Sequence, residues 1–148
     1  MSDEPPEIFR GVELFENERY TPLTGWSSKG LLLTDRKAFT TADGQSGWSS
    51  LEEASEYYLS CGTLIHCDLS HLSYLHFIGW RWYSSPSHGS ESILWKVDVF
   101  LENCDDDGWA YATDFNSFTD HNSGTRIKSM VHFVRRRRYL RKQYFDGK

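Results

Sequence analysis

Alternating apolar and polar positions run through most of the chain and predict extended strands rather than helices. The segments predicted to be strands are residues 8–20, 80–82, 93–100, 109–115 and 127–140. The short apolar run 31–33 is predicted to be a buried strand. Successive side chains of a strand point to opposite faces, so Trp80 and Trp82 share one face while Arg81 takes the other. Turn signals such as Asp107-Gly108 separate the segments. The pattern predicts a mostly β fold of antiparallel strands.

One segment has helical spacing. Ser50 stands where an N-cap is expected, Glu53 follows three residues later, and Ala54, Tyr57 and Tyr58 supply the apolar face. This helix belongs to a short helical or irregular insertion at about residues 45–79. Residues 1–7 are expected to be a disordered leader, and residues 8–145 a single domain.

Composition adds two facts to this picture. The 148 residues include six Trp, eight Tyr and nine Phe, so planar side chains must carry much of the packing. Residues 126–148 hold nine of the 16 Lys and Arg but one of the 21 Asp and Glu, which makes the chain electrically two-sided. Three cysteines cannot all pair, and no apolar run is long enough to span a bilayer, which favours a cytoplasmic protein.

The four consecutive arginines, Arg135 to Arg138, are the most unusual feature. On a strand, Arg135, Arg137, Tyr139 and Arg141 point one way, so guanidinium groups occupy both faces. Arginine is planar and weakly hydrated, and can lie between aromatic rings while its edges reach carboxylates. Candidate carboxylates are Asp98, Asp107 and Asp114. Three interpretations remain: internal stacking, which we favour, contact of outward arginines with anionic lipid, and nucleic-acid binding, which the acidic net charge disfavours.

Ordered motif blocks give the chain a resemblance to the dysferlin domain family. The blocks are Phe15-Glu16-Asn17-Glu18-Arg19-Tyr20, Gly25-Trp26, Trp80-x-Trp82, Trp95-x-Val97-Asp98, Asp107-Gly108-Trp109-x-Tyr111-Ala112 and Val134 to Arg141. The resemblance implies that Trp80, Trp82, Trp95 and Trp109 interleave with Arg135, Arg136, Arg137 and Arg138. In kind the chain is most similar to the small stand-alone fungal sporulation-specific member of that family.

That resemblance implies a function. We expect a non-enzymatic, peripheral lipid-binding or membrane-contact adaptor acting in fungal sporulation, in extension of the prospore membrane. Its partner would be a phospholipid or sphingolipid surface, and it would lie on the cytoplasmic side of the prospore membrane or endoplasmic reticulum. The alternative is a protein-interaction module that a membrane-tethered partner recruits, without direct lipid binding.

The candidate lipid-contacting residues are Trp26 and Trp48, which lie in turn-rich contexts outside the expected stack, together with Phe77, Arg141 and Lys142. Phe77 belongs to the apolar stretch 72–78, which is either a packing element over the core or a hydrophobic edge for a bilayer interface. Basic residues near the C-terminus would add attraction to an anionic leaflet.

The sequence gives weaker support for a metal site or for enzyme activity. Asn103, Asp105, Asp107 and Asp114 mimic a calcium loop, but strands flank it and a turn is the simpler interpretation. The spacing of Cys61, His66, Cys67, His71 and His76 fits no familiar zinc site. No nucleophile elbow, phosphate loop or paired-carboxylate motif is present, so we expect no enzyme activity, no metal, no cofactor and no nucleic-acid partner.

Overall fold

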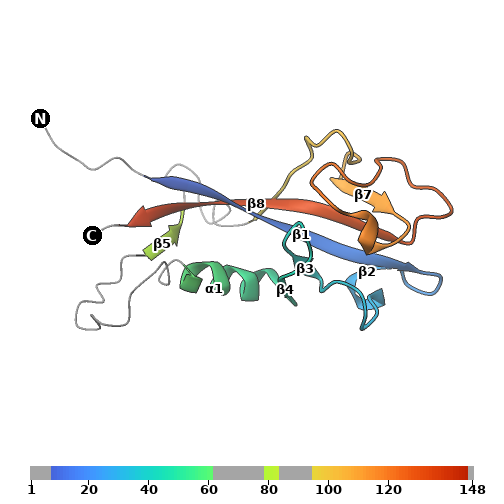
Figure 1. Ribbon diagram of the computed structural model, residues 1–148, viewed down its shortest axis with the longest axis horizontal. Helices are drawn as coiled ribbons and strands as arrows, with labels where there is room; N and C mark the ends of the chain where they lie inside the picture. The colour runs from blue at the N-terminus through green and yellow to red at the C-terminus, as the bar shows by residue number, and fades with distance from the viewer. Residues whose placement is uncertain (1–7, 62–78, 84–94, 147–148) are drawn as a thin grey trace, which may run out of the picture.

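Two long antiparallel strands form the axis of the fold. The computed structural model describes residues 8–61, 79–83 and 95–146, and strands β1 (Phe9–Thr21) and β8 (Val134–Asp146) run along its length (Figure 1). Their register pairs Phe9 with Tyr144 at one end and Arg19 with Val134 at the other. The basic end of the sequence therefore lies directly beside the acidic strand β1.

Short strands extend this ribbon on both sides, and every pairing is antiparallel. On the β1 side lie β2 (Gly25–Ser27), β3 (Phe39–Thr40) and β4 (Gly47–Trp48). On the β8 side lie β5 (Gly79–Trp82), β6 (Lys96–Val97) and β7 (Trp109–Ala112), each pairing a different part of β8. The predicted mostly β, antiparallel fold with one helix is confirmed.

The helix α1 (Leu51–Cys61) begins where the sequence predicts. The Ser50 Oγ accepts a hydrogen bond from the Glu53 N–H at 3.1 Å, and the Glu53 carboxylate accepts one from the Ser49 N–H at 2.8 Å. The first bond satisfies a backbone donor of the first helical turn, and the second ties the segment before the helix to that turn. Two single-turn 3₁₀ helices, η1 (Ser28–Gly30) and η3 (Phe115–Ser117), shape the loops.

The core consists of two clusters. Under α1, buried Val12, Leu14, Trp48, Ala54 and Trp95 pack together. Toward the β7 end, the second cluster contains Ala110, Ala112, Phe115, Phe118 and Val134. Both clusters share the β1–β8 ribbon, which makes that ribbon the element on which the rest is assembled.

One predicted strand is wrong, and another begins later in the chain than predicted. Leu32 and Leu33 are exposed, at 57% and 108%, in the loop after η1 instead of forming a buried strand. The last strand begins at Val134, not at residue 127, because β1 pairs with β8 only as far as Arg19 and its chain then turns into β2. Residues 127–132 have no partner strand among the described residues, and they remain irregular.

Other predictions are shortened or lie outside the described residues. Of the predicted strand 93–100, residues 93 and 94 lie outside the described residues, and within 95–100 the strand is Lys96–Val97. The strand from Trp109 ends at Ala112. The leader 1–7, residues 62–78 of the insertion and the loop 84–92 are outside the described residues. Within the part of the chain that is described, no helix has the length and apolar character needed to cross a membrane.

Candidate interaction surfaces

A ladder of alternating rings and guanidinium groups covers one face of β8. The Arg135 guanidinium carbon lies 4.9 Å from the Trp26 ring centroid and 3.8 Å from that of Trp109. On the other side of Trp109, the Arg137 carbon is 4.4 Å away, and it is 5.3 Å from Tyr139. Each such contact stabilises by about 0.5–2 kcal/mol, depending on how far water is excluded. The ladder is Trp26, Arg135, Trp109, Arg137 and Tyr139.

Glutamates of β1 hold the edges of this ladder. The Arg135 Nε donates to Glu18 at 2.8 Å, and the Arg137 Nε donates to Glu16 at 2.6 Å. These residues are directly opposite in the strand register, so the antiparallel pairing itself aligns each charge pair. Glu16 and Glu18 were not among the carboxylates expected to pair with the arginines. The sequence does contain a sign of this pairing: Glu16 and Glu18 are two residues apart, as Arg135 and Arg137 are, so each pair lies on one face of its strand.

Arg138 differs from its neighbours because carboxylates, not rings, dominate its contacts. It donates to Glu13 at 2.8 Å and to Asp98 at 3.1 Å. Asp98 was one of the three carboxylates expected to pair with the arginines. Asp114 instead caps η3, accepting from the Ser117 N–H at 3.1 Å.

Arg136 lies on the opposite face and is 1% exposed. Its guanidinium carbon is 4.2 Å from the Phe15 ring centroid and 4.4 Å from that of Phe118. It donates to the backbone carbonyls of Ala42, at 3.1 Å, and Asp120. Burial, with the nearby Arg36 cation, lowers the pKa of Arg136 to about 10. The residue is a structural cation, not a surface for anions.

The remaining expected stacks form with other arginines. Trp82 lies 4.1 Å from the Arg141 guanidinium carbon, with Trp95 farther away at 6.0 Å. Trp80 packs on Arg10 at 4.1 Å. The expected interleaving of these three tryptophans with Arg135 to Arg138 is therefore wrong, and only Trp109 takes that place. The β8 register explains the shift, since β5 pairs with residues 143–146 and not with the arginine run.

The candidate lipid-contacting residues do not form one surface. Trp48 is 6% exposed and packs under α1 against Tyr57 and Tyr58, so the expectation that it is a surface residue is wrong. Trp26 belongs to the ladder and is half-buried. Phe77 is outside the described residues. Arg141 is held by Trp82, and among the described members of the set Lys142 is the exposed one.

The calcium-like segment is a turn. Asp105 accepts hydrogen bonds from the Asp107 N–H at 3.0 Å, the Trp109 N–H at 2.8 Å and the Tyr111 hydroxyl at 2.8 Å. Gly108 supplies the positive φ of 87° that the turn requires. Among the residues with described positions, no group of three metal-ligating side chains is found. The zinc candidates His66, Cys67, His71 and His76 lie outside that part.

An exposed apolar segment, which we call the apolar loop, precedes β8 at residues 126–133. Ile127 is 74% exposed and Met130 94% exposed, and Val131 and Phe133 are exposed as well. Arg126 and Lys128 accompany them, with no acidic residue in the segment. The Phe133 carbonyl accepts from the Tyr20 N–H at 2.9 Å, which attaches the loop to the end of β1. These apolar residues are three, one and two positions apart, which is not the alternation of a strand with one buried face.

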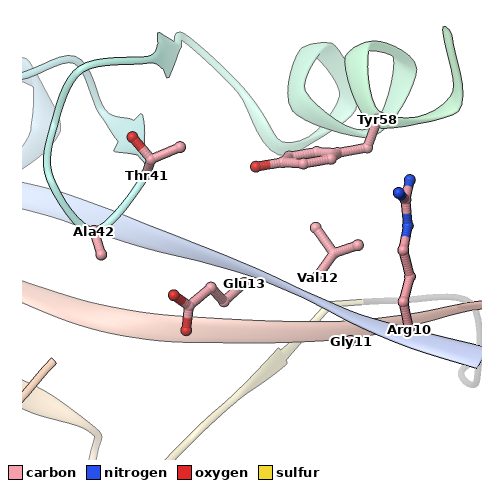
Figure 2. A pocket seen from close by; sticks show the side chains of 7 residues that line it. All are labelled: Arg10, Gly11, Val12, Glu13, Thr41, Ala42 and Tyr58. Atoms are coloured by element: carbon pink, nitrogen blue, oxygen red, sulfur yellow. The ribbon is translucent and has the colours of Figure 1, made fainter. Parts of the chain in front are cut away.

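Two hollows lie beside β1, and Arg10 and Gly11 line both of them. The smaller, of about 300 Å³, is lined by Arg10, Gly11, Val12, Glu13, Thr41, Ala42 and Tyr58 (Figure 2). The larger, of about 700 Å³, has mostly apolar walls that include Phe9, Tyr83, Phe100 and Leu140. Lys142 also lines the larger hollow, 4.1 Å above the Phe9 ring.

Together these features define a small antiparallel β module whose strands are tied by arginine–aromatic stacks and cross-strand ion pairs. No family model matches the chain. The chain is similar to tectonin β-propeller repeat-containing protein 1 of Homo sapiens, at 32% identity over 132 residues. The same protein of Gallus gallus is 32% identical over 133 residues, and a tectonin β-propeller repeat-containing protein of Drosophila melanogaster is 30% identical over 131. Each match covers 87–88% of this chain but only 7–8% of the relative.

These findings correct the expected family and the expected biology. The relatives are tectonin β-propeller repeat-containing proteins of animals, and no family model supports membership of the dysferlin domain family. Nothing in the relatives supports sporulation, the prospore membrane or lipid binding, and those expectations are withdrawn. The antiparallel fold and the arginine–aromatic stacking are shown by the strand pairings and ring contacts of the structure, whichever family the chain belongs to.

Proposed function

We propose that this chain is a protein-interaction module without catalytic activity, which associates with membranes through a partner protein. The similarity to short stretches of much longer relatives supports a module-like role. In this proposal the module lies peripherally on the cytoplasmic side of an internal membrane, held by a membrane-tethered partner.

The observation that carries the proposal is the apolar loop. Most exposed apolar residues of a soluble protein are scattered singly and have no special role. Here Ile127, Met130, Val131 and Phe133 crowd into seven residues, and they are attached to the rigid end of the β1–β8 ribbon. Contiguous exposed apolar surface is typical of a protein contact site. Arg126 and Lys128 give the contact a positive border, which favours an acidic partner surface.

Membrane recruitment tests the proposal. The purified chain is mixed with membranes from cells that express it, with the same membranes after trypsin stripping, and with protein-free liposomes made from their lipids. We expect cosedimentation with the native membranes only, because the partner is a protein. Association with the protein-free liposomes would contradict recruitment through a partner and make the contact a direct one with lipid.

Variants assign the effect to the apolar loop. The triple variant Ile127→Ser, Met130→Ser, Val131→Ser is expected to lose at least about ten-fold in membrane association, the loss of a central apolar contact. Leu33→Ser is the matched control, because Leu33 is 108% exposed in a different loop. Equal loss in both variants, or in neither, would show that the apolar loop is not the docking surface.

A further inference from the structure

Hydrogen-bond directions along β1 show which of its residues face away from β8. The Tyr20 N–H donates to Phe133 on the β8 side at 2.9 Å, while the Asn17 N–H donates to Ala38 on the other side at 2.7 Å. At the far end of β1, the Ile8 carbonyl accepts from β8 at 2.9 Å. Backbone groups alternate in direction along an antiparallel strand. Even-numbered residues of β1 therefore face β8, and odd-numbered residues face the opposite edge.

That opposite edge is covered for only part of its length. Strand β3 ends at Thr40, opposite Phe15, and the chain then turns back into β4. Gly11 and Glu13 therefore direct their N–H and C=O groups to an edge where no strand pairs among the described residues. The Glu13 side chain is held elsewhere, by Arg138, so the open feature is the backbone. Unpaired strand edges of this kind are templates for another strand.

Neither packing nor backbone conformation among the described residues requires a glycine at position 11. A Cβ built on it would meet nothing within 4 Å, so no close packing inside the fold requires a glycine there. Its φ is not among the positive values, so the backbone does not require one either. Glycine weakens a strand interior, and it often marks a place where another backbone approaches closely.

Both hollows border Gly11 on this edge strand. Figure 2 shows Val12 below Tyr58 of α1, with Thr41 and Ala42 beside them at the smaller hollow. The larger hollow opens between the rings of Phe9, Tyr83 and Phe100. Gly11 lines both hollows, so a chain paired with β1 at Gly11 lies next to each of them.

We propose that β1 accepts an extended segment of a partner protein as an additional strand along residues 9–13. Backbone hydrogen bonds to Gly11 and Glu13 hold the segment, and its side chains alternate between the two hollows. The larger hollow takes an aliphatic or aromatic side chain. The exposed Lys96 and Lys142, which both line that hollow, favour an acidic residue beside it. The inference rests on the proposed role as an interaction module, but it uses a surface separate from the apolar loop.

Amide exchange of the full chain measures whether the edge is open. We expect the N–H groups of Gly11 and Glu13 to exchange at least about 100-fold faster than those of Val12 and Leu14, which face β8. Equal protection of all four amides would mean that the edge is already covered, and would overturn the proposal.

A synthetic probe measures strand addition directly. The probe is a capped seven-residue peptide in which valine alternates with aspartate and threonine, added at up to millimolar concentration. We expect it to shift the Gly11 and Glu13 amide resonances and to slow their exchange. A matched peptide, N-methylated at every second residue, lacks one edge of donors and is expected to bind at least about ten-fold more weakly. Absence of any shift, or equal binding of both peptides, would overturn the proposal.

Substitutions at Gly11 separate the backbone contact from folding. Gly11→Pro removes the outward N–H alone, because the ladder to β8 does not use it, and proline is tolerated on an edge. Gly11→Ala keeps the donor. Both variants are expected to remain folded in denaturant titration, with probe binding kept in the alanine variant and reduced at least about ten-fold in the proline variant. Equal binding in both would overturn the proposal.

Two further outcomes are decisive. Concentration-dependent dimerisation that Gly11→Pro abolishes would make a second copy of the chain the occupant and overturn the assignment to a partner. The triple serine variant of the apolar loop should bind the probe normally. Failure of the probe with intact membrane recruitment would reject the edge site alone, and the reverse result would reject the proposed function alone.

Discussion

At the scale of single residues, the four arginines of the run are held in three different kinds of surroundings. Arg135 and Arg137 share the two faces of Trp109 and pair with glutamates across the strand. Arg136 is buried between two phenylalanine rings with carbonyl acceptors, and Arg138 is held by two carboxylates. A planar cation with several donors can do all of this, whereas an ammonium group cannot.

Replacing Arg136 by lysine should therefore destabilise the fold strongly. Lysine keeps the charge but loses the planar stacking on Phe15 and Phe118 and cannot reach both carbonyl acceptors. We expect the free energy of unfolding to fall by about 3 kcal/mol, as for breaking a buried charged network. Urea denaturation measures this. The exposed Arg126→Lys is the control, with an expected change below about 0.5 kcal/mol. Equal stability of the two variants would rule out the buried stack.

Tyr139 should make the fold sensitive to alkali. Burial, with the nearby Glu16 carboxylate, raises the pKa of Tyr139 to about 12. An unfolded tyrosine ionises near pH 10, so between these values the unfolded state has lost a proton that the folded state keeps. This contribution to stability is fully present below about pH 10 and is lost as the pH rises toward 12.

The measurement is urea denaturation of the wild type and of Tyr139→Phe from about pH 9 to about pH 11. The wild type is expected to lose about 1 kcal/mol more than the variant over this range, a value reduced by the partial exposure of the ring. Parallel pH dependences of the two proteins would mean that Tyr139 titrates normally in the fold.

At the scale of elements, pairing decides where strands begin and end. The apolar and basic composition of residues 127–133 is compatible with a strand, but among the described residues no strand pairs with them. Trp80 and Trp82 lie on the same strand as predicted. Because β5 pairs with the end of β8, Trp80 stacks on Arg10 and Trp82 stacks on Arg141. Periodicity predicts which side chains share a face, and it does not predict which strand lies opposite.

The turn before β7 provides a test at this scale. Gly108 has a φ of 87°, and a Cβ there would lie 2.8 Å from Val97 Cγ1 and 3.1 Å from the Asp98 carbonyl. Gly108→Ala is expected to cost about 1–3 kcal/mol through backbone strain and the displaced β6 segment. Gly11→Ala, whose Cβ meets nothing within 4 Å, should change stability by less than about 0.5 kcal/mol. Thermal and urea unfolding of both variants provide the comparison, and a neutral Gly108→Ala would contradict the tight turn.

At the scale of the whole molecule, charge separation along the sequence becomes charge pairing in space. Antiparallel pairing of β1 with β8 brings Glu13, Glu16 and Glu18 beside the arginines. Three of the four consecutive arginines are thereby paired with carboxylates within the fold. What remains for partners is the apolar loop at one end of the ribbon and the uncovered edge of β1 nearer the other.

The sequence by itself determined the class of fold, the helix and its cap, and the alternation of the arginine run. These depend on local periods and on side-chain chemistry within a few residues. It did not determine the partner of each ring, the burial of Trp48, or the exposure of residues 126–133. Those depend on strand register and on which edges lack a neighbour, because contacts between positions more than 100 residues apart are set only when β1 and β8 pair.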